Sequence, residues 1–363
     1  LVVIGVSVSR LNLGKIILMN NARRGYGGRL YGVGSEEGEV EGVRVYKNVS
    51  FLPETPDAAI IITPAETIPA ILRERGLKGI RHVVIESGGF SEFSKGAGAL
   101  ENEIVDIARE FEIRIIGPNC IGTINFEINM MMPFAFYSRD FTVGSFSVIS
   151  QSGGVGNTFL HALPDNHVFL NKFVAVGNKL QLDEADFLSY YLSDPGTSAI
   201  VAYLEGFSRG REFFDSAMAA DKPVIVQKSN RSAASASIAQ SHTTALSSGD
   251  DIVEAAFRQS AVIRVEDEEE LVSAAKIMQL PLMRGRRVAV LSRSGGHAVI
   301  SADACDKFGF EMVPFPESFI QKVKSMYKSR VISHQNPLDL GEIFDYTIFI
   351  NILREAIALP EID

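Results

Sequence analysis

One histidine of the sequence stands among small polar residues. His242 lies in the stretch IAQSHTTALSSGDD, and the nearest acidic residues are Asp250 and Asp251. The surrounding Ser, Thr, Gly and Ala suit neither a dry core nor a zinc site, and no metal site is expected in this chain. Imidazole has an ordinary pKa of about 6.5, so it can exchange protons or accept groups near neutral pH. Chemistry at His242 and a merely exposed histidine both fit this pattern.

A second candidate is a loop after a strand-like apolar run. Residues 146–154 read FSVISQSGG, and residues 288–296 repeat the pattern as VAVLSRSGG. A strand that breaks into such a loop and then into a helix presents free N–H groups, which bind phosphate or carboxylate. A tight turn without a ligand also favours Gly and Ser. In the first copy the predicted anion-binding residues are Ser150, Gln151, Ser152, Gly153 and Gly154.

A carboxylate ends another apolar run. The stretch AYLEG places Glu205 at the carboxyl edge of the predicted sheet, where open α/β folds bind ligands. A carboxylate that accepts from one imidazole nitrogen fixes the tautomer and leaves the other nitrogen as a nucleophile. If His242 approaches both Glu205 and the SQSGG loop, backbone donors would hold a phosphoryl group on the imidazole. The sequence thus outlines a phosphohistidine site.

Three other patterns carry less chemistry. GVSVSR, residues 5–10, follows a strand but lacks two glycines of the dinucleotide fingerprint, which disfavours an NAD-dependent dehydrogenase. Cys120 in IIGPNCIG follows a strand, as some nucleophiles do, but with no histidine nearby a packing role is favoured. The acidic run EDEEEL, residues 266–271, is interpreted as the solvated start of a helix.

The elements that must position these residues alternate between β-rich runs and amphipathic helices, the pattern of α/β folds with parallel sheets. Five strands are predicted in a first unit: LVVIGVS, GRLYGVG, AAIIIT, HVVIES and IRIIGP. Five more are predicted in a second: SFSVIS, KFVAVG, SAIVAYLEG, KPVIVQK and SAVIRV. A third unit begins with RVAVLS after the basic break MRGRR.

The segment INMMMPFAFYSRDF separates the first two units and shows no clear period. Because Pro133 interrupts any helix or central strand, a connecting segment is expected. Its apolar side chains could line a pocket for a larger acid, or pack between domains. Between the second and third strands of the first unit, GVGSEEGEVEG is interpreted as an acidic surface turn.

The composition excludes several classes of protein. The 363 residues carry 35 basic and 44 acidic side chains, a net charge of −9, which argues against a broad surface for nucleic acid or anionic lipid. Two cysteines form no disulfide framework, and this fits a reducing cytoplasm. No apolar run reaches the roughly 18 residues of a transmembrane helix. Both ends of the sequence resemble the ends of a fragment.

The motifs together resemble a known family, the α subunit of ADP-forming acyl-CoA synthetases, which are relatives of the succinyl-CoA synthetase α subunit. The resemblance is carried in order by IIGPNCIG, SVISQSGGVGN, VGNKLQLDEADFL, AYLEG, KPVIVQK followed by SHT, AAFRQSAVIRV, and RVAVLSRSGG with NPLDL. It implies three α/β domains: a CoA-binding Rossmann-like domain at residues 1–128, a flavodoxin-like phosphohistidine domain at 143–280, and a second flavodoxin-like domain at 286–363, incomplete at its C-terminus.

The resemblance also implies a reaction, the interconversion of acyl-CoA, ADP and phosphate with acid, CoA and ATP through an acyl phosphate and a phosphohistidine. His242 matches the phosphorylated histidine and Glu205 its supporting glutamate. Residues 150–154 match the phosphate-binding loop, and Gly5, Ser7, Asn119 and Cys120 match the CoA-binding motifs. ADP or ATP and Mg would bind an ATP-grasp domain on a partner subunit or on a missing C-terminal part. A cytoplasmic oligomer is expected.

The sequence departs from the family pattern at three places, one of which is Asn230-Arg231, where the family has Gly-Arg. Gly34, Ser35 and Glu36 stand where the family has Asn-Pro-Lys, so a carboxylate replaces a cation near the CoA phosphates. Thr244 and Ser248 stand where glycines are expected beside the histidine, and their loss would stiffen a segment thought to swing. A CoA-binding or regulatory module without turnover is therefore the alternative to an active enzyme.

Overall fold

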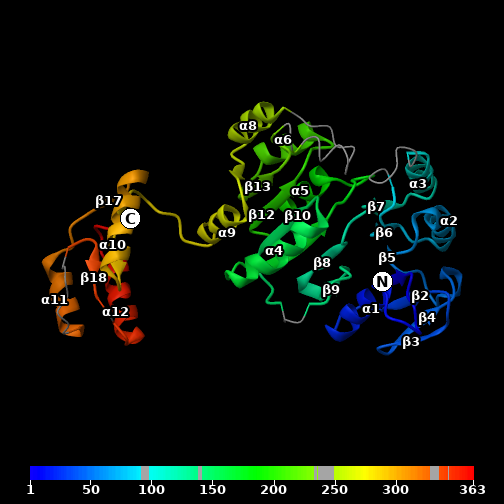
Figure 1. Cartoon of the computed structure of the whole chain (residues 1–363), viewed down its shortest axis with the longest axis horizontal. Helices are drawn as coiled ribbons and strands as arrows, with labels where there is room; N and C mark the ends of the chain where they lie inside the picture. The colour runs from blue at the N-terminus through cyan, green and yellow to red at the C-terminus, as the bar shows by residue number, and fades with distance from the viewer. Residues whose placement is uncertain (91–97, 138–140, 233–234, 236–248, 328–334, 342) are drawn as a thin grey trace. The chain divides into compact units, whose positions relative to one another are not determined.

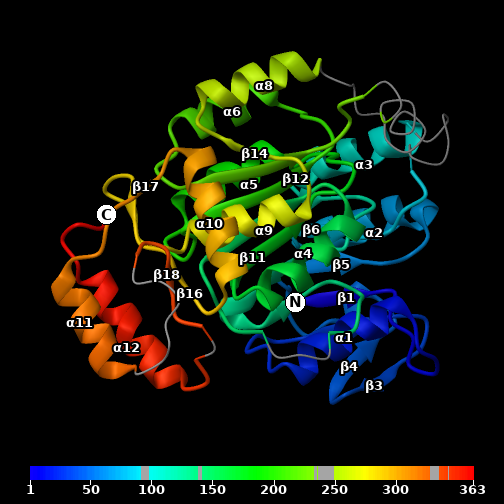
Figure 2. The same ribbon diagram turned by 60° about the vertical axis from the view of Figure 1, so that its left-hand side comes forward.

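The computed structural model of the chain divides into two compact units, Leu1–Leu280 and Pro281–Asp363. It describes residues 1–90, 98–137, 141–232, 235, 249–327, 335–341 and 343–363. Among these residues, unit 1 contains two seven-stranded sheets with helices packed against them (Figures 1 and 2). The predicted α/β class is confirmed.

The first sheet has the strand order β3-β4-β2-β1-β5-β6-β7. Its strands are β1 (Val2–Ile4), β2 (Tyr31–Val33), β3 (Gly38–Val40), β4 (Val43–Tyr46), β5 (Ala58–Ile61), β6 (His82–Ile85) and β7 (Arg114–Ile116). All neighbours are parallel except β3 and β4. The acidic stretch predicted to be only a turn therefore also contributes an edge strand. Val40 is the buried residue of that strand, and its remaining residues are exposed, so the apolar signal was too short to indicate it.

Three helices accompany this sheet: α1 (Leu13–Arg23), α2 (Ile68–Lys78) and α3 (Gly98–Glu110). Asn12 caps α1, since its side chain accepts a hydrogen bond from the N–H of Lys15 at 3.0 Å. Ile104 and Ile107 on α3 lie one turn apart and are buried against Val83 and Ile85 of β6. The alternating side chains of β6 thus bury both of its faces.

The second sheet has the order β14-β13-β12-β10-β11-β8-β9. Its strands are β8 (Thr123–Asn125), β9 (Met130–Met131), β10 (Phe146–Ser150), β11 (Leu170–Ala175), β12 (Ala199–Leu204), β13 (Val224–Lys228) and β14 (Ile263–Val265). The five strands from β10 onward are parallel, whereas β8 pairs antiparallel with β11 and with β9. Part of the predicted connecting segment is therefore a sheet edge, and residues 123–131 belong to the second sheet.

Two faces of the second sheet bury different helices. Val148 and Ile149 are neighbours on β10 and point to opposite faces, because strand side chains alternate. On the face of Val148 lie α4 (Gly153–Asp165) and α9 (Glu268–Ile277), and on the face of Ile149 lie α5 (Glu184–Ser193), α6 (Gly210–Met218) and α8 (Asp250–Gln259). The loops at the carboxyl ends of the strands are thus held by a core on both sides.

One hydrophobic core joins the two sheets. It contains Ile17 and Leu18 of α1 together with Met131 and Met132 of the INMMMPFAFY segment. The buried Asn21 of α1 accepts a hydrogen bond from the N–H of Met131 at 2.9 Å. The packing alternative proposed for this segment is thus realised for these methionines, and the two sheets form a single unit.

The described residues of unit 2 form two short parallel strand pairs. One joins β15 (Arg287–Val288) to β17 (Glu311–Met312), and the other joins β16 (Leu291–Ser292) to β18 (Leu338–Asp339). RVAVLS was expected to form one strand. It is divided into β15 and β16, and between them the side chain of Asn336 replaces a neighbouring strand as hydrogen-bond partner of the main chain. Its Oδ1 accepts from Val290 N at 2.9 Å, and its Nδ2 donates to Val288 O at 2.7 Å. The helices are α10 (Gly295–Phe308), α11 (Glu317–Met326) and α12 (Tyr346–Ile357).

Candidate active site

The SQSGG loop lies where β10 ends and α4 begins. Ser152 is the N-cap of α4, and its Oγ accepts a hydrogen bond from the N–H of Val155 at 3.4 Å. A Cβ on Gly153 would lie only 2.8 Å from Cγ2 of Ile121, so glycine allows the helix start to approach the loop after β7. The first N–H groups of a helix have no acceptors within the helix, and its dipole favours negative charge there. The start of α4 is therefore suited to an anion.

The IIGPNCIG loop is held by contacts on both sides. Gly117 has φ +94°, and a Cβ there would lie 2.3 Å from Ile85 O, so only glycine fits. The N–H of Asn119 donates to Ser87 O at 2.9 Å, and its side-chain Nδ2 donates to Asn178 Oδ1 at 3.2 Å. Because Ser87 follows the first sheet and Asn178 follows β11 of the second, this loop connects the two sheets at the site.

Cys120 is buried in this loop, with its Sγ 3.4 Å from Ile85 O. Burial, followed by the nearby carboxyl of Glu86, raises the pKa of its thiol above the usual value. A thiol is a poor nucleophile until it ionises. These surroundings support the packing role favoured for Cys120 over a nucleophilic one.

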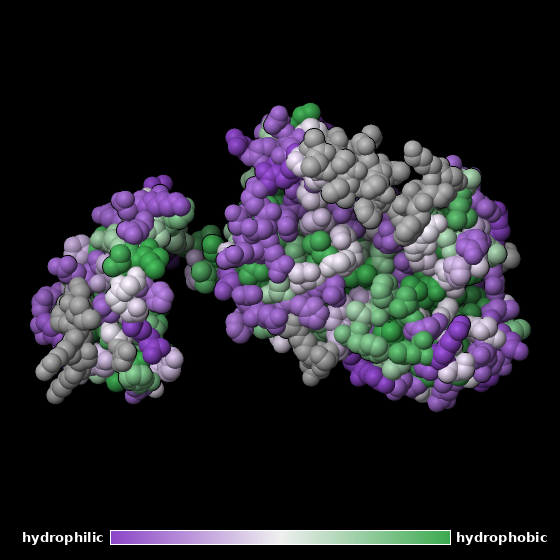
Figure 3. Space-filling view, in the orientation of Figure 1, coloured by the Kyte–Doolittle hydropathy of each residue, from purple (hydrophilic) through white to green (hydrophobic). Residues whose placement is uncertain are grey.

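A cavity of about 570 Å³ lies between these two loops and is called the junction cavity here. It is lined by Leu13, Ile62, Thr63, Pro64, Glu86, Ser87, Gly88, Asn119, Cys120, Ile121, Phe134, Gly153 and Gly154. Two residues of the predicted CoA motif and two of the predicted phosphate loop thus face one space. Phe134 shows that the INMMMPFAFY segment also contributes to a cavity wall, while its methionines pack between the sheets. Hydrophobic residues also gather on the surface over α1 and the neighbouring strands (Figure 3).

The predicted CoA residues Gly5 and Ser7 lie elsewhere. Gly5 lines a second cavity of about 260 Å³ that also contains Gly34, Ser35 and the cation Lys47. Ser7 belongs to the turn before α1, where its Oγ accepts from Arg10 N at 3.3 Å. Lys47 directly follows β4, and no motif of the sequence indicated that it would line this cavity. A cation is thus present although Asn-Pro-Lys is not.

The Glu36 carboxylate accepts hydrogen bonds from the loop before α1. Its oxygens lie 3.2 Å from Ser9 N and 3.1 Å from Ser9 Oγ. The carboxylate noted in the sequence is therefore held by local hydrogen-bond donors, although the contact is exposed.

Glu205 lies at the end of β12, beside the SQSGG loop. The side chain of Gln151 accepts hydrogen bonds from the N–H of Glu205 at 2.9 Å and of Gly206 at 3.2 Å. Lys179 donates to the same Gln151 Oε1 at 3.2 Å and forms a buried ion pair with Glu184 at 3.0 Å. Gln151 therefore fixes the position of the predicted supporting glutamate relative to the anion-binding helix start.

Comparisons with known proteins agree with this arrangement. Residues 1–125 match the CoA binding domain family, and residues 143–278 match the succinyl-CoA ligase like flavodoxin domain family. The chain is 35% identical over 93% of its length to subunit alpha of the ADP-forming acetate–CoA ligase II of Pyrococcus furiosus, and covers 73% of that protein. It is 34% identical to subunit alpha of ligase I of the same organism, of which it covers 78%. The chain belongs to the ADP-forming acyl-CoA ligase family.

A solved structure of the family has the same fold. The acetyl-coenzyme A synthetase 1 of Ca. Korarchaeum cryptofilum, in complex with phosphate and ADP, superposes on the whole chain with a TM-score of 0.88 at 30% identity, and 78% of that protein is covered. Other relatives are longer. The chain spans about half (49%) of the ADP-forming acetate–CoA ligase I of Archaeoglobus fulgidus, to which it is 36% identical over 93% of its own length.

Sequence reasoning overlooked Lys228, the last residue of β13. Its Nζ donates to the main-chain oxygen of Glu205 at 2.9 Å, and burial lowers its pKa to about 8. The only sequence signal was a lysine at the end of the apolar run KPVIVQK. Lys228 thus places an amine beside Glu205 and stabilises the strand end that carries it.

The proposed phosphorylated residue His242 lies outside the described residues, as do Thr244 and Ser248. On either side of that stretch, Arg231 and Asp250 approach to 3.5 Å, and Asp250 also pairs with Arg264 at 2.6 Å. Asn230 Nδ2 donates to Glu205 O at 3.2 Å. The described residues before and after the stretch are thus fixed near one another, with Asn230 against Glu205.

Two further searches covered the described residues, one for metal-binding groups and one for membrane-spanning helices. Their His, Cys, Asp and Glu side chains form no group of three or more that could hold a metal ion. None of the described helices combines the length and the apolar character needed to span a membrane.

Proposed function

We propose that this chain is the CoA-binding and phosphohistidine-carrying part of an ADP-forming acyl-CoA ligase. The proposed reaction interconverts acyl-CoA, ADP and phosphate with carboxylic acid, CoA and ATP. The observation that carries the proposal is the junction cavity, because a thioester placed at Asn119 and a phosphate placed at Gly153 and Gly154 would meet within one space.

Each step has a proposed site on this chain. Phosphate binds the N–H groups at the start of α4 and attacks the thioester carbonyl, which releases CoA and forms an acyl phosphate. The phosphoryl group then moves to an imidazole nitrogen of His242, which releases the carboxylic acid. Glu205 stabilises the imidazolium and orients the ring, as carboxylates do beside nucleophilic histidines. Gly5 and Ser7 are proposed to contact CoA, and Lys47 to attract its phosphates.

The second half of the reaction needs a nucleotide site. We infer that an ATP-grasp domain binds ADP or ATP with Mg, on a partner subunit or on a further part of the polypeptide. The relatives support both arrangements, since some are named as α subunits and others are longer chains that this one half covers. Assembly into an oligomer in the cytoplasm is part of the same proposal.

The proposal can be tested without the partner. Purified chain is incubated with acetyl-CoA and [32P]phosphate, and the label on the protein is treated with acid and with base. Acid-labile, base-stable label is expected on the wild type and is expected to be lost in His242→Asn. Label that survives in His242→Asn would rule out the role assigned to that residue. Glu110→Gln, an exposed change on α3, serves as the matched control.

The alternative is a CoA-binding module that has lost turnover, which Thr244 and Ser248 beside His242 favour. It predicts that calorimetry detects CoA and acyl-CoA binding while no label forms. Replacing both residues by glycine should then restore labelling if stiffness of the segment is the cause. The absence of both CoA binding and label would contradict the active and the inactive form of the proposal.

A further inference from the structure

The main chain leaves the second sheet just before Glu205. β12 ends at Leu204, whose partner on the neighbouring strand is Lys228, and Ser229 N donates to Leu204 O at 3.0 Å. Glu205 and Gly206 therefore lie beyond the strand that positions them. Glu205 is only partly buried, at the sheet edge where open α/β folds bind ligands. The groups that hold this short segment decide where the proposed supporting carboxylate points.

Side chains bond all four main-chain polar groups of Glu205 and Gly206. Both N–H groups donate to Gln151 Oε1. Lys228 Nζ donates to Glu205 O at 2.9 Å, and Lys179 Nζ donates to Gly206 O at 2.8 Å. The three side chains come from the loops after β10 and β11 and from the last residue of β13. Lys179 and Lys228 together are called the lysine clamp here.

Both amines of the lysine clamp are buried. The side chain of Lys179 is 5% exposed and pairs with the fully buried Glu184. Lys228 forms no ion pair within the described part of the chain, and its Nζ donates to Ser229 O as well as to Glu205 O. Removing an ammonium group from water opposes its charge, which is why burial lowers the pKa of Lys228. Two desolvated amines are thus committed to the carbonyl oxygens of one short segment.

The other end of β13 provides a comparison. Lys222 lies two residues before that strand, and its Nζ donates to Tyr191 O at 3.0 Å and to Asp194 O at 2.7 Å. Lys222 and Lys228 therefore both bond two main-chain oxygens. They differ in place, because Lys222 lies at the amino end of the strand and Lys228 at the carboxyl end, beside Glu205.

If the proposed function holds, Glu205 must present its carboxylate to an imidazole nitrogen. A displacement of about 1 Å at such a site can lower a rate by about 100-fold, and side chains behind the reacting groups prevent it. We propose that Lys179 and Lys228 are positioning residues of this reaction, which fix the direction of the Glu205 carboxylate by bonding the carbonyl oxygens on either side of Gly206 N–H. The inference rests on the proposed function, and neither lysine is assigned a contact with substrate.

The first test separates rate from binding. The full chain is mixed rapidly with saturating acetyl-CoA and [32P]phosphate, and the rate constant of protein labelling is measured against phosphate concentration. Lys228→Met should lower the rate constant at saturating phosphate by about 10- to 100-fold and leave the half-saturating concentration within about threefold, because misplacing Glu205 affects the transition state. Lys179→Met should change both values, since Lys179 also bonds Gln151 of the phosphate loop. Lys222→Met is the matched control and should change neither.

The second test is a double-mutant cycle. Glu205→Gln and Lys228→Met should each slow labelling, and the double variant should be little slower than Glu205→Gln alone, because residues that act as one unit are not additive. Thermal melting of each variant sets the assay temperature below its transition. Lys228→Gln keeps an N–H donor, so it should recover part of the rate, and it keeps the test valid if Lys228→Met does not fold.

The outcomes separate this inference from the proposed function. Wild-type labelling rates in Lys228→Met overturn the inference and leave the ligase proposal standing. Equal slowing by Lys222→Met, or additive losses in the cycle, overturns it as well, because the lysine would then stabilise the fold without acting through Glu205. A raised half-saturating phosphate concentration at an unchanged rate constant in Lys228→Met would mean that this lysine binds phosphate, against the inference. No label on the wild type overturns the proposed function, and the role of the lysine clamp with it.

Discussion

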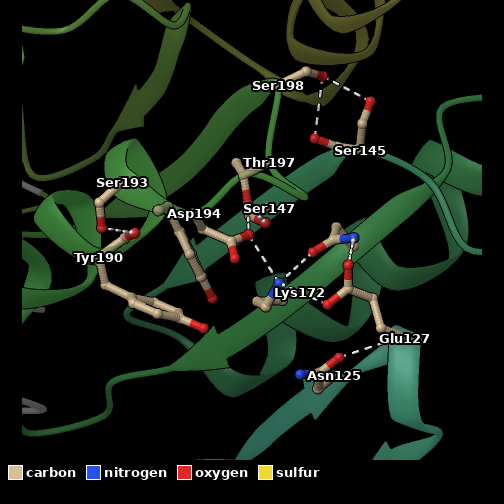
Figure 4. A network of polar contacts seen from close by, with 12 residues as sticks. Asn125, Glu127, Ser145, Ser147, Lys172, Tyr190, Ser193, Asp194, Thr197 and Ser198 are labelled. Carbon is tan, nitrogen blue, oxygen red and sulfur yellow. Dashed lines mark hydrogen bonds and ion pairs between the residues drawn. The ribbon is translucent and has the colours of Figure 1, made fainter.

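Two buried ionisable side chains of unit 1 lie in opposite surroundings. Lys172 of β11 is 5% exposed, and its Nζ lies 2.8 Å from Asp194 Oδ2 and 3.1 Å from Glu127 Oε2 (Figure 4). Thr197 donates to Asp194 at 2.7 Å, which extends the network. Glu86 is 4% exposed and has no such partner among the described residues. Lys172 is buried within a hydrogen-bonded network, whereas Glu86 is buried without a side-chain hydrogen bond among the described residues.

The pKa values of these groups follow the same division. Burial alone would lower the pKa of Lys172, but hydrogen bonds with Asp194 and Glu127 raise it. Burial raises the pKa of Glu86, and none of the groups in the described part of the chain offsets this effect. A network that is fully satisfied contributes to stability, whereas an unpaired buried polar group costs stability. The contrast can therefore be tested by stability measurements in the absence of ligand.

The largest effect is expected at Lys172. Lys172→Met removes one partner of a buried network and leaves the Asp194 carboxylate without its cation, which should lower the free energy of unfolding by about 3 kcal/mol. Urea denaturation followed by circular dichroism measures this change. The control is Arg73→Met, where the cation is half-exposed and its carboxylate partners lie at 3.4 and 3.8 Å. A loss of less than about 0.5 kcal/mol is expected there, and equal losses at both sites would contradict a special role for the buried network.

The opposite sign is expected at Glu86. Glu86→Met replaces an unpaired polar group by an apolar one of similar length, so the ligand-free protein should gain about 1 kcal/mol of unfolding free energy. The same urea titration measures it at about pH 4, where the carboxyl group is largely protonated in both the folded and the unfolded state and Glu86→Gln is therefore expected to change little. If Glu86→Met instead destabilises the protein as Lys172→Met does, the carboxyl group has a structural partner and the contrast fails.

Much of the fold follows from the sequence because its signals are local. The five parallel strands of the second sheet are the five apolar runs, and β10 and β12 are neighbours, so the SQSGG loop and Glu205 meet at one sheet edge as predicted from strand ends. The repeat of this loop in unit 2 likewise follows a strand and starts a helix, α10. These predictions needed only the apolar runs of the strands and the glycine and serine residues that follow them, and no information about tertiary contacts.

The remaining features depend on residues far apart in the chain. Lys172 begins the run KFVAVG, and its buried amine is paired with Glu127 and Asp194, which lie 45 and 22 positions away in the sequence. Glu86 directly follows β6, and its carboxyl group lies against Gly122, which is 36 positions away in the sequence. The same holds for β8, which joins the second sheet by pairing with β11, and for β9, which pairs in turn with β8. A local pattern contains no information about such partners.

The smallest expected effect is on the pH dependence of stability, and its sign differs between the two regions. Glu86 has a folded-state pKa above the unfolded value of 4.5, so its contribution is present below about pH 4.5 and is lost as pH rises through the folded pKa. Burial alone would raise the pKa of Asp194, but hydrogen bonds from Lys172 and Thr197 lower it below 3.8. Its contribution is therefore present above that pH and lost as pH falls through the folded pKa.

Urea titrations between pH 3 and 8 on wild type, Glu86→Gln and Asp194→Asn would show both signs. Relative to wild type, Glu86→Gln should become progressively more stable as pH rises from 4.5, because the amide cannot ionise. Asp194→Asn should be least stable relative to wild type near neutral pH and should approach it as pH falls toward 3. Parallel curves for Glu86→Gln and wild type would mean that the carboxyl group titrates normally and is not isolated from water and cations.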